Sequence, residues 1–179
     1  VDDPTKAEII IVNTCGFIRP AREEAIDTIN DLARHKSKKQ IMIAAGCMAE
    51  KYSDDLKKHC KKIDAILGTR KVNQIGQVIE KLRSGLSLQS LSGRFDMDNL
   101  SQYAIQGYSA YLKIADGCSR KCAFCDIPNI KGEWHSRPVE SILHDASELN
   151  SKGVRELILI AQDTTAYGID RGEKDALPD

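Results

Sequence analysis

Short apolar runs alternate with amphipathic segments through the first half of the chain. Uninterrupted apolar runs are typical of parallel strands buried on both faces, and we expect such strands at residues 8–13, 41–45 and 63–67. Apolar residues at helical spacing predict helices at residues 21–35 and 72–82, and Ser53 as an N-cap predicts a short helix at residues 53–58. This alternation predicts an α/β fold whose N-terminal domain is a doubly wound parallel sheet.

The pattern breaks over residues 85–107, which are rich in Ser, Gly, Gln and Asn and lack a sustained apolar period. We therefore expect domains at residues 1–84 and 108–179, joined by this linker. In the second domain, strands are expected at residues 111–115 and 156–161. Between them, Pro138 suits the first turn of a helix whose buried stripe would be Val139, Ile142, Leu143, Ala146 and Leu149. A strand-loop-helix-strand order without closure predicts the opening part of a β/α barrel in a truncated chain.

Composition excludes some broad classes of function. The 26 basic and 26 acidic side chains cancel, so composition gives no reason to expect a nucleic-acid coat. No apolar run approaches the length of a membrane span, and the start of the chain lacks a signal-peptide pattern. The cytoplasm is therefore the expected location.

Three of the six cysteines, Cys118, Cys122 and Cys125, have the spacing C-x3-C-x2-C directly after a predicted strand. Thiolates hold iron–sulfur clusters, and three ligands for a cubane of four irons leave one iron open to a small molecule. Arg120 and Lys121 lie inside the loop, where their charges favour the thiolate form. At the carboxyl end of a barrel strand, such a loop would occupy the usual place of a barrel active site.

The spacing alone leaves other interpretations open. A zinc site is one alternative, with His135 as its fourth ligand, and free thiols are another. Phe124 offers an aromatic surface to an adenine ring, but it equally suits simple packing.

Residues 111–132, together with Ser136-Arg137-Pro138, resemble the radical S-adenosylmethionine core of the methylthiotransferases. The resemblance implies that the three cysteines bind a [4Fe–4S] cluster whose open iron chelates S-adenosylmethionine. One electron from that cluster releases a 5′-deoxyadenosyl radical, which abstracts hydrogen from an unreactive carbon. The resemblance also places four residues near the cofactor as candidates, namely Phe124, Arg137, Gln162 and Asp163. A surface salt bridge is an equal alternative for Arg137.

Cys15 and Cys47 each follow a predicted parallel strand, so both thiols belong at one edge of the sheet. Two buried structural cysteines would be the more common explanation. However, Asn13-Thr14-Cys15-Gly16-Phe17, Arg22-Glu23-Glu24 and residues 45–52 are similar to the N-terminal domain of the same family.

The similarity implies that Cys15 and Cys47 are two of three ligands of a second [4Fe–4S] cluster. The third family ligand lies upstream, in a segment that this sequence does not contain, so we expect the chain to bind the second cluster poorly or not at all. Cys60 fits no motif, and we expect a spare thiol there.

Residues 161–170 resemble the branch of the family that adds a methylthio group to an aspartate β-carbon of ribosomal protein twelve, in the decoding centre of the small subunit. The tRNA branch usually has Gln-Asn-Val where this chain has Gln-Asp-Thr. The alternatives are methylthiolation of the tRNA adenosine next to the anticodon, or a non-catalytic iron–sulfur or zinc-binding module. The electron donor and the sulfur source are not predicted, and we expect this piece alone to be inactive.

Overall fold

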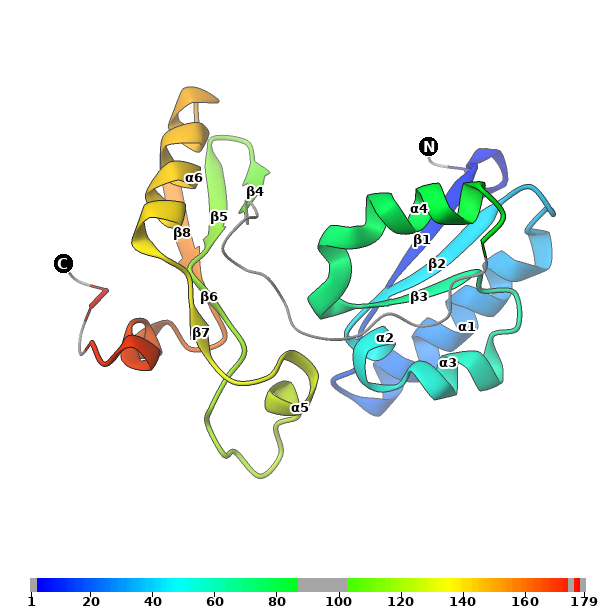
Figure 1. The fold of residues 1–179 in the computed structure, drawn as a ribbon, viewed down its shortest axis with the longest axis horizontal. Coiled ribbons are helices and arrows are strands. Elements are labelled where there is room, and N and C mark those ends of the chain that lie inside the picture. The colour runs from blue at the N-terminus through cyan, green and yellow to red at the C-terminus, as the bar shows by residue number, and fades with distance from the viewer. Residues whose placement is uncertain (1–2, 87–102, 174–175, 178–179) are drawn as a thin grey trace. The chain divides into compact units, whose positions relative to one another are not determined.

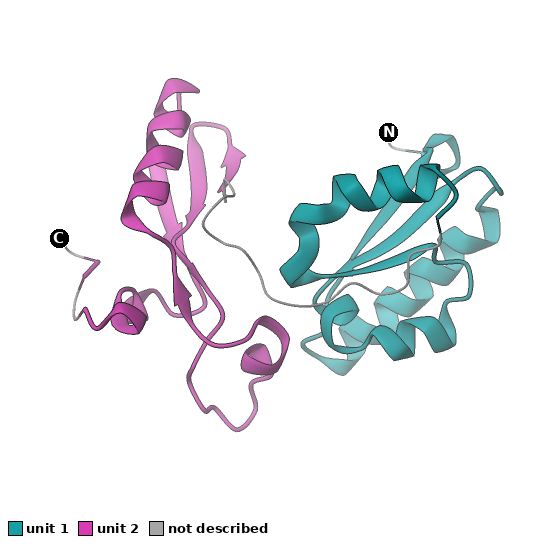
Figure 2. Cartoon of the chain, in the orientation of Figure 1, with its two compact units in different colours: residues 1–95 teal, residues 96–179 magenta. Residues whose placement is uncertain are grey.

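The computed structural model describes residues 3–86, 103–173 and 176–177. The chain divides into two compact units, residues 1–95 and 96–179 (Figure 2). Much of the predicted linker, residues 87–102, lies outside the described residues. Within its last part, residues 103–106 form strand β4 (Tyr103–Gln106). This strand pairs antiparallel with the next one across a turn in which Gly107 takes a positive φ of 63°.

The first unit contains the predicted parallel sheet (Figure 1). Its strands β1 (Ile9–Thr14), β2 (Ile41–Gly46) and β3 (Ala65–Gly68) lie in the order β1-β2-β3. The predicted strands are confirmed, with bounds that differ by one or two residues at most ends.

The helices of the first unit include the three that were predicted and one that was not. They are α1 (Arg19–His35), α2 (Cys47–Lys51), α3 (Ser53–His59) and α4 (Ile75–Arg83), with short 3-10 turns η1 (Pro4–Lys6) and η2 (Thr69–Gln74). The unpredicted element is α2, which starts immediately after β2. Residues 72–74, predicted to begin the last helix, belong to η2 instead.

Helices cover both faces of this sheet. Ile29 of α1, Met48 of α2 and Leu56 of α3 pack on one face, whereas Val78 of α4 packs on the other. Burial on both faces explains why β2 and β3 are apolar throughout, whereas β1 is mostly apolar but alternates between buried and more exposed residues.

In the second unit, β4 and β5 (Ser109–Lys113) are antiparallel, and β5 is parallel to β8 (Glu156–Ile160). Helix α6 (Val139–Ser151) connects the two parallel strands and buries Leu149 against Ala110 and Val154. This β-α-β unit agrees with the predicted opening part of a barrel. Shorter elements complete the unit: β6 (Ala115–Asp116), α5 (Ile127–Lys131), β7 (His135–Ser136), η3 (Thr164–Ala166) and η4 (Ile169–Arg171).

A membrane span is not found within the described part of the chain, since none of its helices combines the necessary length and hydropathy.

Candidate functional site

Cys118, Cys122 and Cys125 lie in the loop that leaves β6 and enters α5. All three are free thiols; Cys118 is buried, Cys125 is half-buried and Cys122 is exposed. The Cys125 N–H donates to the Cys122 carbonyl at 3.1 Å, and the backbone nitrogen of Arg120 lies 3.5 Å from the Cys118 sulfur. The loop therefore turns back on the Cys118 sulfur.

Hydrogen bonds close the base of this loop. The Cys118 N–H donates to the Gly132 carbonyl at 3.1 Å, and the Trp134 N–H donates to the Ser119 hydroxyl at 3.1 Å. Gly117 has a φ of +75°, and a Cβ at this position would lie 2.1 Å from the Glu133 carbonyl oxygen. Only glycine fits there, because both the conformation and the space exclude a side chain.

A largely buried carboxylate lies just before the loop. Asp116 accepts from Lys131 at 2.7 Å and pairs with Lys113 at 3.2 Å. Burial alone would raise the pKa of Asp116, but the two ammonium groups outweigh burial and lower it. Burial lowers the pKa of Lys113, and Asp116 opposes this effect. The cluster links the strand before the cysteines to the helix after them.

The end of β8 contacts the cysteine loop through Asp163. Its carboxylate accepts from Thr165 at 2.6 Å and from the Arg120 Nε at 2.8 Å. These two hydrogen bonds, that from Thr165 first, lower the pKa of Asp163. By contrast, Gln162 is exposed and Phe124 is 88% exposed. The structure thus brings one of the predicted cofactor residues to the loop and leaves two open to solvent.

Arg137 occupies a buried position. Its guanidinium donates to the Lys113 carbonyl at 2.7 Å and pairs with Asp145 of α6 at 2.8 Å. The two side chains are only 1% and 2% exposed, so the surface salt bridge considered for Arg137 is wrong. These contacts make Arg137 part of the packing between α6 and β5.

Sequence reasoning missed the network around Ser136. The Ser136 hydroxyl bonds with Asp170, and it accepts from the Trp134 indole and from the Gly168 N–H at 3.0 Å each. Tyr167 donates its hydroxyl to the Arg137 carbonyl at 2.9 Å. The end of the stretch at residues 161–170 therefore packs on Ser136-Arg137. The only sequence signal was that both stretches belong to recognised motifs.

Three free thiols in one loop, one of them facing a backbone N–H, suit an iron–sulfur cluster. Within the described residues, no three His, Cys, Asp or Glu side chains converge closely enough to hold one metal ion. The His135 Nδ1 lies 3.6 Å from an Asp170 oxygen, which gives this ring a carboxylate neighbour on η4.

In the first unit, Cys15 and Cys47 follow the paired residues Thr14 and Gly46 at the carboxyl edge of the sheet. The two turns touch, since a Cβ on Gly16 would lie 2.8 Å from the backbone nitrogen of Met48. Both cysteines therefore follow strands that end at the same edge of the sheet, as predicted, and the turns that contain them are in contact.

Arg22 and Tyr52, two residues of the recognised motifs, hold these turns from outside. The Arg22 Nη1 donates to the Gly16 carbonyl at 3.2 Å, and its guanidinium lies 4.5 Å from the centre of the Tyr52 ring. Tyr52 ends α2 by donating its N–H to the Met48 carbonyl at 2.7 Å. One side chain thus joins the Cys15 turn to the end of the helix that Cys47 begins.

Cys60 lies away from this edge. It is 3% exposed and belongs to the apolar core beneath α1 and α3. Burial raises the pKa of its thiol. Cys60 is thus a core residue at the end of α3.

Two family models match the chain. Residues 1–68 match the uncharacterized protein family UPF0004, and residues 112–176 match the radical SAM superfamily. Among curated proteins, the chain is 44% identical to the ribosomal protein uS12 methylthiotransferase of Thermoanaerobacter sp., covering 99% of the chain and 42% of that relative. It is 42% identical to the uS12 methylthiotransferase of Symbiobacterium thermophilum, covering 96% of the chain and 36% of the relative. The chain thus spans about two fifths of the length of these relatives.

Proposed function

The chain belongs to the radical S-adenosylmethionine methylthiotransferase family, and we propose that it takes part in adding a methylthio group to ribosomal protein uS12. Membership of this family implies S-adenosylmethionine and iron–sulfur chemistry. The observation that carries the proposal is the cysteine loop at the end of β6, in a chain 40–44% identical to uS12 methylthiotransferases over nearly all of its length. An aspartate β-carbon is the proposed site of modification.

We assign Cys118, Cys122 and Cys125 as ligands of a [4Fe–4S] cluster. When bound there, the cluster would supply the electron that cleaves S-adenosylmethionine. The chain's own contribution is positional: Gly117 and the Cys118–Gly132 hydrogen bond hold the loop, and Arg120 joins it to Asp163. Phe124 and Gln162 are both exposed and remain available to a ligand of the cysteine loop.

We propose Cys15 and Cys47 as two ligands of a second cluster, which handles the sulfur to be inserted. Their support is the contact between the two turns and the Arg22–Tyr52 stack that joins them. A third ligand must come from elsewhere, since Cys60 lies in the core. A ribosomal substrate would place the activity in the cytoplasm.

The test uses the protein as its gene encodes it, reconstituted with iron and sulfide without oxygen. It is supplied with S-adenosylmethionine, a reductant and small ribosomal subunits that lack the modification. A methylthio group on a uS12 aspartate, found by peptide mass spectrometry, is the expected result. Modified tRNA with unmodified uS12 would replace the proposal by the tRNA alternative. An intact cluster without cleavage of S-adenosylmethionine would remove both.

A further inference from the structure

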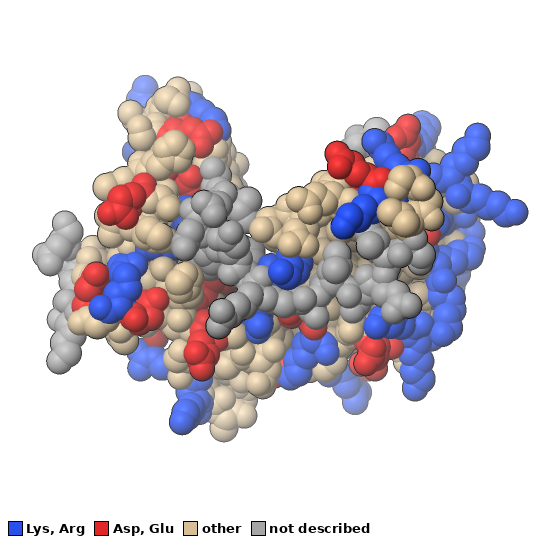
Figure 3. Space-filling model, in the orientation of Figure 1, with Lys and Arg blue, Asp and Glu red and all other residues tan. Residues whose placement is uncertain are grey.

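A basic surface covers the end of the first unit opposite to Cys15 and Cys47. It is formed by residues 34–39, where α1 ends, and by residues 57–62, where α3 ends. Lys62 donates to the Ala33 carbonyl at 2.8 Å and Lys36 pairs with Asp64 at 3.0 Å, so the two segments lie against each other. In Figure 3, basic side chains gather along this side of the first unit.

The charge of this surface departs from that of the chain. Residues 31–39 and 54–64 carry eight Lys and Arg against four Asp, although the whole chain is neutral. Some of these cations have local roles, since Arg34 pairs with Asp31 at 2.8 Å and Lys57 with Asp54 at 3.2 Å. Others do not: within the described residues, the exposed Lys38 and Lys39 form no ion pair, and they lie beyond the end of α1, in the segment that leads to β2.

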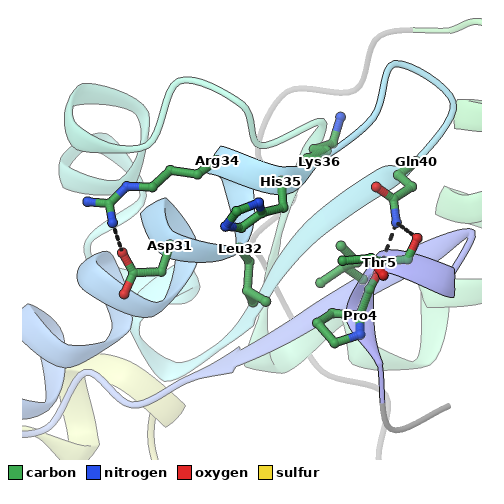
Figure 4. A pocket seen from close by; sticks show the side chains of 9 residues that line it. Pro4, Thr5, Asp31, Leu32, Arg34, His35, Lys36 and Gln40 are labelled. Carbon is green, nitrogen blue, oxygen red and sulfur yellow. Dashed lines mark hydrogen bonds and ion pairs between the residues drawn. The ribbon is translucent and has the colours of Figure 1, made fainter.

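A hollow of about 390 Å³ opens at the end of α1, lined by residues on both sides of Lys38 and Lys39 in the sequence. Apolar side chains of Ile10, Leu32 and Pro4 contribute to its lining, together with His35, Lys36 and the ion pair of Arg34 with Asp31 (Figure 4). One wall is fixed, because the Gln40 amide donates to the Pro4 carbonyl at 2.9 Å and to the Ala7 carbonyl at 2.7 Å. The hollow is large enough for a planar aromatic group, and the exposed Lys38 and Lys39 lie in the segment between its lining residues Lys36 and Gln40.

We propose that this surface binds unpaired RNA, with lysines on the phosphates and one base in the hollow against His35. Basic grooves combined with an aromatic platform are the usual means of holding single-stranded nucleic acid. An acidic peptide would use the charge but not the hollow, so RNA fits both features. The proposal rests on the proposed function, because a ribosomal protein in the small subunit is surrounded by RNA. Binding at this edge leaves the carboxyl edge with Cys15 and Cys47 free.

The test measures binding of a fluorescent unpaired RNA oligonucleotide to the whole chain, without clusters, over a series of salt concentrations. The double variant Lys38→Gln/Lys39→Gln should weaken binding about tenfold at low salt and reduce the slope of log affinity against log salt by about 1.4. The control Lys71→Gln/Lys81→Gln removes the same charge elsewhere in the unit and should change neither quantity. His35→Ala should weaken binding at least about fivefold without changing the slope, since stacking releases no counterions.

Equal affinity of the two double variants would overturn the proposal, as would equally tight binding of poly-glutamate. Weaker RNA binding by His35→Ala supports stacking only if the variant is folded, which far-UV circular dichroism checks. If this variant unfolds, Leu32→Ala beside His35 replaces it. The RNA-binding assay needs neither cluster nor S-adenosylmethionine. If RNA binding fails, the methylthiotransferase proposal still stands, and if methylthiolation of uS12 fails, the RNA-binding result still stands.

Discussion

Truncating Arg137 tests whether this arginine holds the second unit together or serves a cofactor. Its guanidinium and the Asp145 carboxylate are 1% and 2% exposed and lie 2.8 Å apart. Arg137→Ala would leave a buried carboxylate without its cation, which costs roughly 3–5 kcal/mol. Domains are stable by only about 5–15 kcal/mol, so the variant should lose a large share of its stability.

Urea unfolding measures this loss, and Trp134 is a suitable probe because it is the one tryptophan of the chain and is buried in the second unit. With a slope of about 1–3 kcal/mol per molar urea, the midpoint should fall by at least about 1 M. The double variant Arg137→Met/Asp145→Leu should recover much of the loss, because apolar residues often replace a buried ion pair at little cost. An unchanged midpoint for Arg137→Ala, combined with weaker binding of S-adenosylmethionine, would refute the structural role.

Three further predictions concern the two cysteine sites. Gly117→Ala should destabilise the second unit by about 2 kcal/mol or more, measured in the same urea assay, because the added Cβ meets the Glu133 carbonyl in a left-handed conformation. Arg22→Gln should slow the bridging of Cys15 to Cys47 by a bifunctional thiol reagent about threefold, as expected for the loss of one cation–π contact. The control Arg19→Gln, one turn earlier on α1, should not slow this bridging. Equal bridging rates for both variants would contradict the role of Arg22 in joining the two turns. The contribution of Asp116 to the stability of the second unit should be fully present above about pH 4 and fall below it, because the folded-state pKa of Asp116 is lowered and its stabilising charge is lost on protonation. A urea midpoint that rises on acidification would contradict this.

The parts of the fold that depend on buried apolar runs were predictable. All three strands of the first unit were found. Strands β2 and β3 are buried on both faces, which produces an uninterrupted apolar pattern, and β1 has a similar apolar run although Ile11 is 48% exposed. Helix α6 shows the limit of periodicity. Its predicted stripe included Val139 and Leu143, which are 47% and 62% exposed, whereas Asp145 is buried. A pattern of apolar residues cannot reveal that a carboxylate is neutralised by an arginine from outside the helix.

The place of the candidate cysteines in the fold was as predictable as the strands that precede them. Placing Cys15 and Cys47 at one edge requires only that parallel strands end together. The contacts that support the sites could not be predicted, because Arg120–Asp163 and Arg22–Tyr52 join segments separated in the sequence by helices and strands. Such pairs depend on how the chain returns to the same place, which local spacing does not encode.

The central claim is that Cys118, Cys122 and Cys125 hold an iron–sulfur cluster to which S-adenosylmethionine binds directly. Electron paramagnetic resonance of the reduced, anaerobically reconstituted chain tests it most directly. We predict the signal of a [4Fe–4S] cluster that shifts when S-adenosylmethionine is added and that is lost in Cys118→Ala but kept in Cys60→Ala. Zinc without iron in the anaerobic protein, or a cluster signal that S-adenosylmethionine leaves unchanged, would contradict the account.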